Sequence, residues 1–269
     1  MNKEALLRSW LQEEEAAHIH GWDFSHIQGR YEEEQDLPWD YREIIMHYLQ
    51  PEMKLLDIDT GGGEFLLSLG HPCDHLAATE NYQPNVALCN GKLLPVGIDF
   101  RKADGSGSFP FEAQSFDMII NRHGSFNADE IWRMLKSDGI FITEQVGAQN
   151  DRELVELLLP DIPDIPFPEQ YLKKAKGIFQ DAGFSVIAAD ETFCPIKFWD
   201  VGALVWFARI IEWEFPNFNV RDCLENLYHA QEILERKGVI EGKIHRYLLV
   251  VKKERRILCY QQEKRQRNF

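Results

Sequence analysis

The chain has 269 residues, of which 44% are hydrophobic, and it carries a formal net charge of −15 at pH 7. That length and apolar content are ample for the core of one large α/β domain. The acidic balance disfavours broad affinity for nucleic acids or anionic membranes, since phosphates are bound chiefly through Lys and Arg.

Cysteine usage and hydropathy disfavour further classes. The five cysteines are widely spaced and odd in number, which indicates neither a disulfide framework nor a zinc site. No apolar run approaches the roughly 18 residues of a membrane span. We therefore expect a soluble, cytoplasmic protein that binds no metal and has no membrane partner.

Residues 1–40 form a predicted N-terminal segment of helix formers and aromatic side chains. The aromatic residues gather just before the first predicted strand and include Trp22, Phe24, Trp39 and Tyr41. An edge of this kind can close over a ligand or plug the sheet. We expect the segment to pack on the core, with Trp22 and Tyr41 as candidates for contact with a substrate.

A glycine-rich turn follows the first predicted strand. The strand runs into Asp57, and Gly61 to Gly63 precede a helix-like segment. Glycine permits a positive φ and lets a ligand approach where a Cβ would block it. A dinucleotide fingerprint needs another glycine three residues after Gly63, but Leu66 stands there. The turn therefore predicts nucleotide binding and disfavours a nicotinamide-linked oxidoreductase.

Apolar strand-like runs alternate with helix-like runs over residues 55–146. This alternation predicts a parallel sheet with helices on both faces. A further helix at 168–182, a strand at 184–189 and a last strand at 244–251 continue the pattern. Ligands of such sheets bind beyond the carboxyl ends of the strands, where we expect the glycine-rich turn to lie.

Acids and glycines at successive strand ends occur in one order: Asp57, the glycines, Glu80 and Asp104. This order resembles that of the class I S-adenosylmethionine-dependent methyltransferases. The resemblance implies a Rossmann-like, doubly wound, mostly parallel seven-stranded sheet with helices on both faces and a helical insertion before the last strand. It also implies that S-adenosyl-L-methionine is the cofactor.

The resemblance assigns roles to particular residues. Glu80 corresponds to the acid that binds both ribose hydroxyls, and Asp104 to the acid that reads the adenine amino group. The implied cofactor-binding set is Asp57, Asp59, Thr60, Gly61, Gly63, Glu80, Asn81, Asp104, Gly105, Asn121 and Arg122. Asp59 departs from the family, which usually has glycine there, and it either contacts the amino end of the cofactor or caps the turn.

The end of the strand at 116–123 is the predicted active-site edge. His123 is the candidate catalytic base, because imidazole titrates near neutral pH; the alternative is a hydrogen-bonded wall residue. The strand end lacks the Asn/Asp-Pro-Pro-aromatic sequence of many amino-methylating enzymes and the Pro-Cys of cytosine-C5 enzymes. These absences favour a small-molecule acceptor, with an RNA methyltransferase or a non-catalytic binding protein as alternatives.

Residues 191–242 form the predicted insertion within a methyltransferase-like domain spanning 41–255. The run 203–213 is apolar nearly all round, which is typical of a buried helix. Trp206 and Trp213 in this run either wall a substrate pocket or pack as core. Residues 256–269 form a basic tail, for which a solvated chain end is favoured over an RNA contact.

Overall fold

A single eight-stranded sheet organises the protein. The computed structural model describes residues 2–18, 23–34 and 36–254. The strand order is β1-β7-β8-β6-β5-β2-β3-β4. The strands are β1 (Tyr31–Glu32), β2 (Leu55–Ile58), β3 (Leu76–Glu80), β4 (Asp99–Lys102), β5 (Phe116–Arg122), β6 (Leu135–Val146), β7 (Phe184–Phe198) and β8 (Ile240–Lys253).

The centre of the sheet is parallel. Strands β4, β3, β2, β5 and β6 pair parallel with one another in that order. Strand β8 is antiparallel to β6 and to β7. This confirms the predicted mostly parallel sheet, although the predicted number of seven strands was one too low. The additional strand, β1, has two residues paired with the edge of β7, which is too short for a period-two pattern in the sequence.

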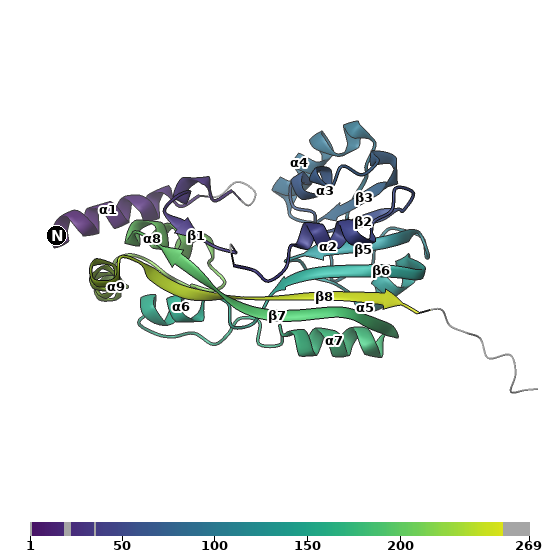
Figure 1. Cartoon of the computed structure of the whole chain (residues 1–269). Helices are drawn as coiled ribbons and strands as arrows, with labels where there is room; N and C mark the ends of the chain where they lie inside the picture. The colour runs from purple at the N-terminus through teal and green to yellow at the C-terminus, as the bar shows by residue number, and fades with distance from the viewer. Residues whose placement is uncertain (1, 19–22, 35, 255–269) are drawn as a thin grey trace, which may run out of the picture.

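Helices cover both faces of the parallel strands, so the doubly wound prediction is confirmed. Neighbouring residues of β2 enter different cores: Leu55 packs with α2, α3 and α4, whereas Leu56 packs with α5 and α7. This follows from the alternation of side chains along a strand. Figure 1 shows α3 and α4 on one side of the sheet and α7 on the other. The helical elements are α1 (Lys3–Ala16), η1 (Ser25–Ile27), α2 (Tyr41–Tyr48), α3 (Glu64–Ser68), η2 (Cys73–His75), α4 (Gln83–Lys92), η3 (Leu94–Val96), α5 (Ala128–Met134), α6 (Arg152–Leu158), α7 (Leu172–Asp181), α8 (Val201–Ile210) and α9 (Leu224–Lys237).

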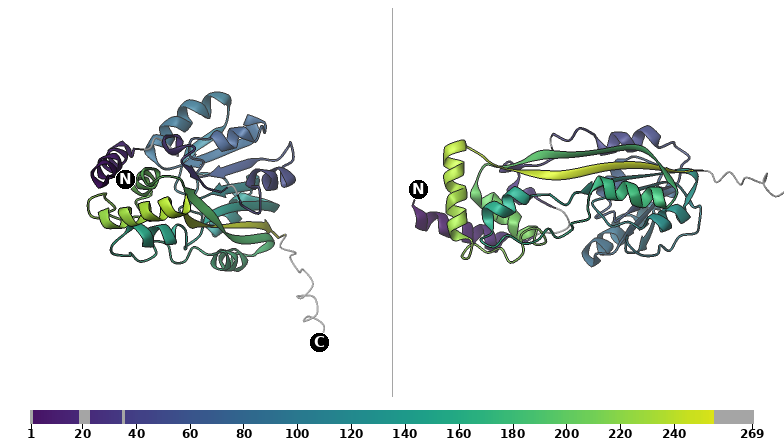
Figure 2. Two further views of the ribbon diagram at one scale, coloured as in Figure 1. Left: turned by 60° about the vertical axis from the view of Figure 1, so that its left-hand side comes forward. Right: turned by 90° about the horizontal axis from the view of Figure 1, so that it is seen from below.

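Strands β7 and β8 are much longer than predicted and form a two-stranded ribbon. Their pairing runs from Phe184 opposite Lys253 to Phe198 opposite Ile240. The ribbon leaves the main sheet and reaches a second group of helices (Figures 1 and 2). Residues 191–198, which we predicted as part of a helical insertion, are therefore strand. The helical part of the insertion is confirmed by α8 and α9.

The second group of helices, α1, α6, α8 and α9, surrounds the far end of the ribbon, and we call it the helical lobe. Residues 201–208 of α8 are all buried, as expected of a helix without a polar face. Trp10 of α1 is buried in the same core. The N-terminal helix therefore packs on the insertion. Within the described ranges, no helix has the length and apolar character needed to span a membrane.

Trp206 of α8 lies at the centre of the helical lobe. Its side chain is 1% exposed, contacts Phe24 edge-on at 5.6 Å, and donates from Nε1 to the Ala16 carbonyl at 3.3 Å. This burial favours core packing over the alternative of a substrate pocket wall.

Replacing Trp206 with Ala should lower the free energy of unfolding by about 3–5 kcal/mol, because it leaves a large cavity in the core of the helical lobe. Urea unfolding followed by circular dichroism measures this. Trp199→Ala is the matched control, because Trp199 is 42% exposed; its effect should stay within about 0.5 kcal/mol. Equal effects of the two substitutions would contradict the assignment of Trp206 to the core.

Candidate functional site

The glycine-rich turn joins β2 to α3 at the carboxyl edge of the sheet. Asp57 is buried near the end of β2, and its Oδ2 accepts a 2.6 Å hydrogen bond from Thr60 Oγ1. Gly61 and Gly63 have φ values of +62° and +79°, which glycine adopts without strain. A Cβ on Gly61 would meet no atom within 4 Å. The turn therefore leaves one side open for the close approach of a ligand.

Glu80 ends β3 beside this turn, as predicted. Its Oε2 accepts from Gly61 N at 2.9 Å and from Asn85 Nδ2 at 3.3 Å. Its Oε1 accepts from the backbone N–H groups of Asn81 and Tyr82 at 2.8 and 2.9 Å. Two donors on each oxygen hold the carboxylate rigidly at the sheet edge. A ribose diol would share these oxygens with the donors or displace some of them.

Asp59 occupies the position where the family usually has glycine, and its φ of +56° matches a glycine position. The backbone N–H groups of Ser125 and Gly105 donate to its carboxylate. A Cβ added to Gly105 or Gly124 would lie 2.5 or 2.6 Å from Asp59 Oδ2. Asp59 therefore links the loops that follow β2, β4 and β5. These donors lie outside the turn that Asp59 begins, and its contact with the amino end of the cofactor stays a prediction.

Four carboxyl groups, those of Asp57, Asp59, Glu80 and Asp104, lie at or just beyond the ends of β2, β3 and β4. Burial, with the charges of Asp59 and Glu80, raises the pKa of Asp57 to about 7. Burial, with the charges of Glu80 and Asp104, likewise raises the pKa of Asp59 to about 7. Asp104 is exposed, and hydrogen bonds from Ser106 lower its pKa. This edge is therefore strongly electronegative, which suits a ligand with positive charge or many N–H and O–H donors.

Asn121 and Tyr41 are turned into the protein. The Asn121 amide donates to the Ile58 carbonyl at 3.0 Å and accepts from Gln145 Nε2 at 2.6 Å. Tyr41 is 6% exposed, and its hydroxyl donates to the Asn121 carbonyl at 3.1 Å. Both side chains make their hydrogen bonds within the protein, in a tightly packed region. The predictions of a cofactor contact for Asn121 and a substrate contact for Tyr41 are thus not supported by their geometry.

Two other predicted substrate residues have different outcomes. Trp22 lies outside the described residues. Trp213 is 44% exposed near the end of α8, and its contact with a substrate stays a prediction. In the part of the chain that the structure describes, no cluster of three or more His, Cys, Asp or Glu side chains is arranged to hold a metal ion.

At the end of β5, Arg122 and His123 adjoin a series of charged side chains. Arg122 Nε donates to Glu144 Oε1 at 2.7 Å, and its Nη2 donates to Glu34 Oε2 at 3.0 Å. The other oxygen of Glu144 accepts from Trp39 Nε1 at 2.6 Å. With both sides of its guanidinium engaged, Arg122 joins the active-site edge to the N-terminal segment. A direct cofactor contact for it stays a prediction.

His123 has a φ of +56°, and its Nε2 lies 3.6 Å from Glu144 Oε1 and 3.8 Å from Glu34 Oε1. Burial and the charge of Arg246 lower the pKa of its imidazole to about 3. His123 is therefore neutral at pH 7 and a weak base.

Sequence reasoning missed several members of this series of charged side chains. Glu34 lies in an acidic triplet that reads as a solvated face, and Arg246 lies in an apolar strand. An arginine among buried β-strand residues is the one signal that was available, because arginine is almost never fully buried unless paired.

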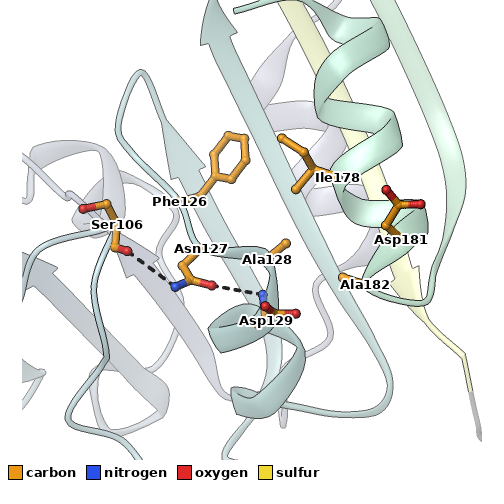
Figure 3. Close-up of a pocket in the computed structure, with 8 residues that line it drawn as sticks. All are labelled: Ser106, Phe126, Asn127, Ala128, Asp129, Ile178, Asp181 and Ala182. Atoms are coloured by element: carbon orange, nitrogen blue, oxygen red, sulfur yellow. Dashed lines mark hydrogen bonds between the residues drawn. The ribbon is translucent and has the colours of Figure 1, made fainter. Parts of the chain in front are cut away.

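Two open cavities lie along α7, away from Glu80 and His123. The first, of about 510 Å³, lies between α5 and α7 and is lined by Ser106, Phe126, Asn127, Ala128, Asp129, Ile178, Asp181 and Ala182 (Figure 3). Asn127 caps α5 there, and its Nδ2 donates to the Ser106 carbonyl at 3.4 Å. The second shares Ile178 and Asp181 with it. Neither cavity includes a predicted site residue.

Residues 56–143, from β2 to β6, match a family model described as a methyltransferase domain. Within this segment the chain is similar to methyltransferases. The matched segment contains the glycine-rich turn, Glu80, Asp104 and the end of β5, which are the features that define the carboxyl edge.

Solved structures have the same fold. A proposed methyltransferase from Bacillus halodurans C-125 is 14% identical, with a TM-score of 0.56, over 80% of this chain and 99% of that one. A protein of unknown function from Deinococcus radiodurans R1 is 13% identical, with a TM-score of 0.56, over 93% and 98%. The YcgJ protein of Bacillus subtilis is 16% identical, with a TM-score of 0.52, over 80% and 98%. No curated protein matches the sequence.

Replacing Asp59 with Asn should raise the melting temperature more at pH 8 than at pH 5. The carboxyl has a folded-state pKa of about 7, above its unfolded value of about 3.9. Its contribution to stability is therefore complete below pH 4 and is lost as the pH rises through 7. Asn keeps an acceptor for the backbone N–H groups.

Differential scanning calorimetry at several pH values measures this difference. Asp161→Asn, in an exposed loop, is the control and should show no such trend. A pH-independent difference between wild type and Asp59→Asn would contradict the raised pKa.

The imidazole of His123 should stay neutral down to about pH 4, since its pKa is lowered to about 3. Carbon-13 NMR of the histidine Cε1–H groups, with His123 assigned by a His123→Gln variant, follows the titration. Titration of His123 near 6.5 would restore it as a candidate general base.

Proposed function

We propose that this protein transfers a methyl group from S-adenosylmethionine to a small-molecule acceptor. The observation that carries the proposal is the pairing of Gly61 N with the Glu80 carboxylate, which joins the open turn to the acid that follows the next strand. This arrangement lies inside the segment that matches the methyltransferase family.

The residues at the carboxyl edge fit such a cofactor. The open side of Gly61 leaves room for the part of the cofactor that lies against the backbone, and the fixed carboxylate of Glu80 suits the ribose diol of the cofactor. The exposed carboxylate of Asp104 can accept a hydrogen bond from the adenine amino group of the cofactor. The other residues that would line the cofactor site are Asp57, Thr60, Gly63, Asn81 and Gly105. Asp59 holds the adjoining loops in place. The bound cofactor supplies an electrophilic methyl group on a sulfonium.

The chain's own residues then have mainly to position the acceptor and exclude water. His123 lies at the end of β5 and offers a neutral hydrogen-bonding imidazole. Because its pKa is lowered to about 3, we assign it a positioning role.

A non-catalytic binding protein on the same fold is the second candidate. Both oxygens of Glu80 already accept two N–H groups, and Asp59 fills the space between Gly105 and Gly124. These contacts would be the same in a protein that kept the fold but no longer bound the cofactor. The basic tail, which an RNA methyltransferase could use, lies outside the described residues.

Calorimetric titration of S-adenosylmethionine and S-adenosylhomocysteine distinguishes the two candidates. We expect micromolar binding of both ligands to the wild type, weakened by roughly tenfold or more, about 1.4 kcal/mol, in Glu80→Gln, which loses the negative charge that favours the diol. Glu112→Gln, an exposed acid, should bind as the wild type does. Absence of binding to the wild type at millimolar ligand would remove the methyltransferase proposal and leave the second candidate.

A further inference from the structure

Arg246 of β8 is the centre of a buried network of charges between the carboxyl edge and the helical lobe. It is 3% exposed and donates to three oxygens, each at 2.6 Å: Glu34 Oε1, Glu33 Oε1 and Asn150 Oδ1. Glu34 also binds Arg122, which binds Glu144. The positive charges of Arg122 and Arg246 are thus balanced by the carboxylates of three glutamates.

Two further carboxyl groups adjoin this network. Asp151 is 1% exposed, and its Oδ2 accepts from Asn150 Nδ2 at 2.8 Å. Its Oδ1 is buried and has no hydrogen-bond partner. Glu214 is 7% exposed and lies close enough to Asn150 and Arg246 for both to influence its ionisation. Arg152 is also near Glu214 but pairs with Glu156 at 3.2 Å.

The network therefore holds more carboxyls than cations. It contains the carboxyls of Glu33, Glu34, Glu144, Asp151 and Glu214 against the guanidiniums of Arg122 and Arg246. Burial raises the pKa of Glu33 and of Glu214, the latter to about 7, and raises that of Asp151 well above its usual range. A buried carboxylate without a partner is costly, so this region is prepared for a positive charge that the described residues do not supply.

We propose that Asp151 and Glu214 bind a protonated amine of the methyl acceptor. An ammonium group supplies three N–H donors and one positive charge, which match the unpartnered Asp151 Oδ1 and the carboxyl of Glu214. An anionic acceptor finds no comparable partner here, because both arginines are already neutralised. The role of this ligand as acceptor rests on the proposed methyl transfer, whereas the amine site itself does not.

The network also reaches solvent and the active-site edge. The side chains of Glu33, Glu34 and His123 are 21%, 22% and 25% exposed. From Asp151 the contacts run through Asn150, Arg246 and Glu34 to His123. These contacts connect the proposed amine site at Asp151 to the end of β5, where the methyl group would be delivered.

Thermal shift and NMR titration with n-butylammonium test the site in the full chain. We expect saturable, millimolar binding that raises the melting temperature, and no such effect from n-butanol or butyrate. Binding should weaken at least tenfold in Asp151→Asn and in Glu214→Gln, and should be unchanged in Asp161→Asn. Circular dichroism verifies folding, and Glu214→Gln decides alone if Asp151→Asn does not fold.

Three results would overturn the inference: no n-butylammonium binding to the wild type, equal binding to the wild type and the folded variants, or butyrate binding as strongly as the amine. The first would mean that Asp151 and Glu214 are simply protonated. Titration of S-adenosylmethionine into the same samples is read separately, so that loss of the cofactor and loss of the amine site are distinguished.

Discussion

The antiparallel pairing of β7 with β8 is the constraint on which the two parts of the molecule depend. At one end this ribbon completes the main sheet beside β6, and at the other it carries the helices that its connection contains. A two-stranded ribbon is only marginally stable alone. Helix α1 and residues from α6, α8 and α9 stabilise its far end by burying Ile196, Phe198 and Ile240 in the helical lobe.

The position of Arg246 follows from that pairing. It lies on β8 opposite Val146 of β6 and Thr192 of β7, where the ribbon leaves the main sheet. Its guanidinium therefore meets acids from the N-terminal segment and Asn150 from the loop after β6. Removing one member of such a buried network leaves an uncompensated charge, which costs more than the net stabilisation that the intact pair provides. The network thus specifies how the N-terminal segment enters the structure.

The carboxyl edge and the charged network differ in what holds their acids. Glu80 accepts hydrogen bonds from backbone N–H groups and one amide, all within a few residues of the strand ends. Glu34 and Glu144 are held by arginines and a tryptophan from distant segments. Backbone donors form a rigid edge that suits a ligand common to all proteins of one fold. Side-chain partners, in contrast, can be replaced by other residues from one such protein to the next. Acceptor recognition on a common fold is accordingly expected in the second set.

Local signals in the sequence determined the mostly parallel sheet and the place of Asp57, Gly61, Glu80 and Asp104 near strand ends, because strand alternation and glycine turns are set within a few residues. Tertiary structure alone decided the length of the β7–β8 ribbon, the lobe that α1 shares with the insertion, and the inward orientation of Tyr41 and Asn121. It also joined Trp39 to Glu144 and Glu34 to Arg246, pairs that are 105 and 212 positions apart. Pairing at an edge strand and between buried charges depends on which segments meet in space, and no periodicity along the chain encodes that.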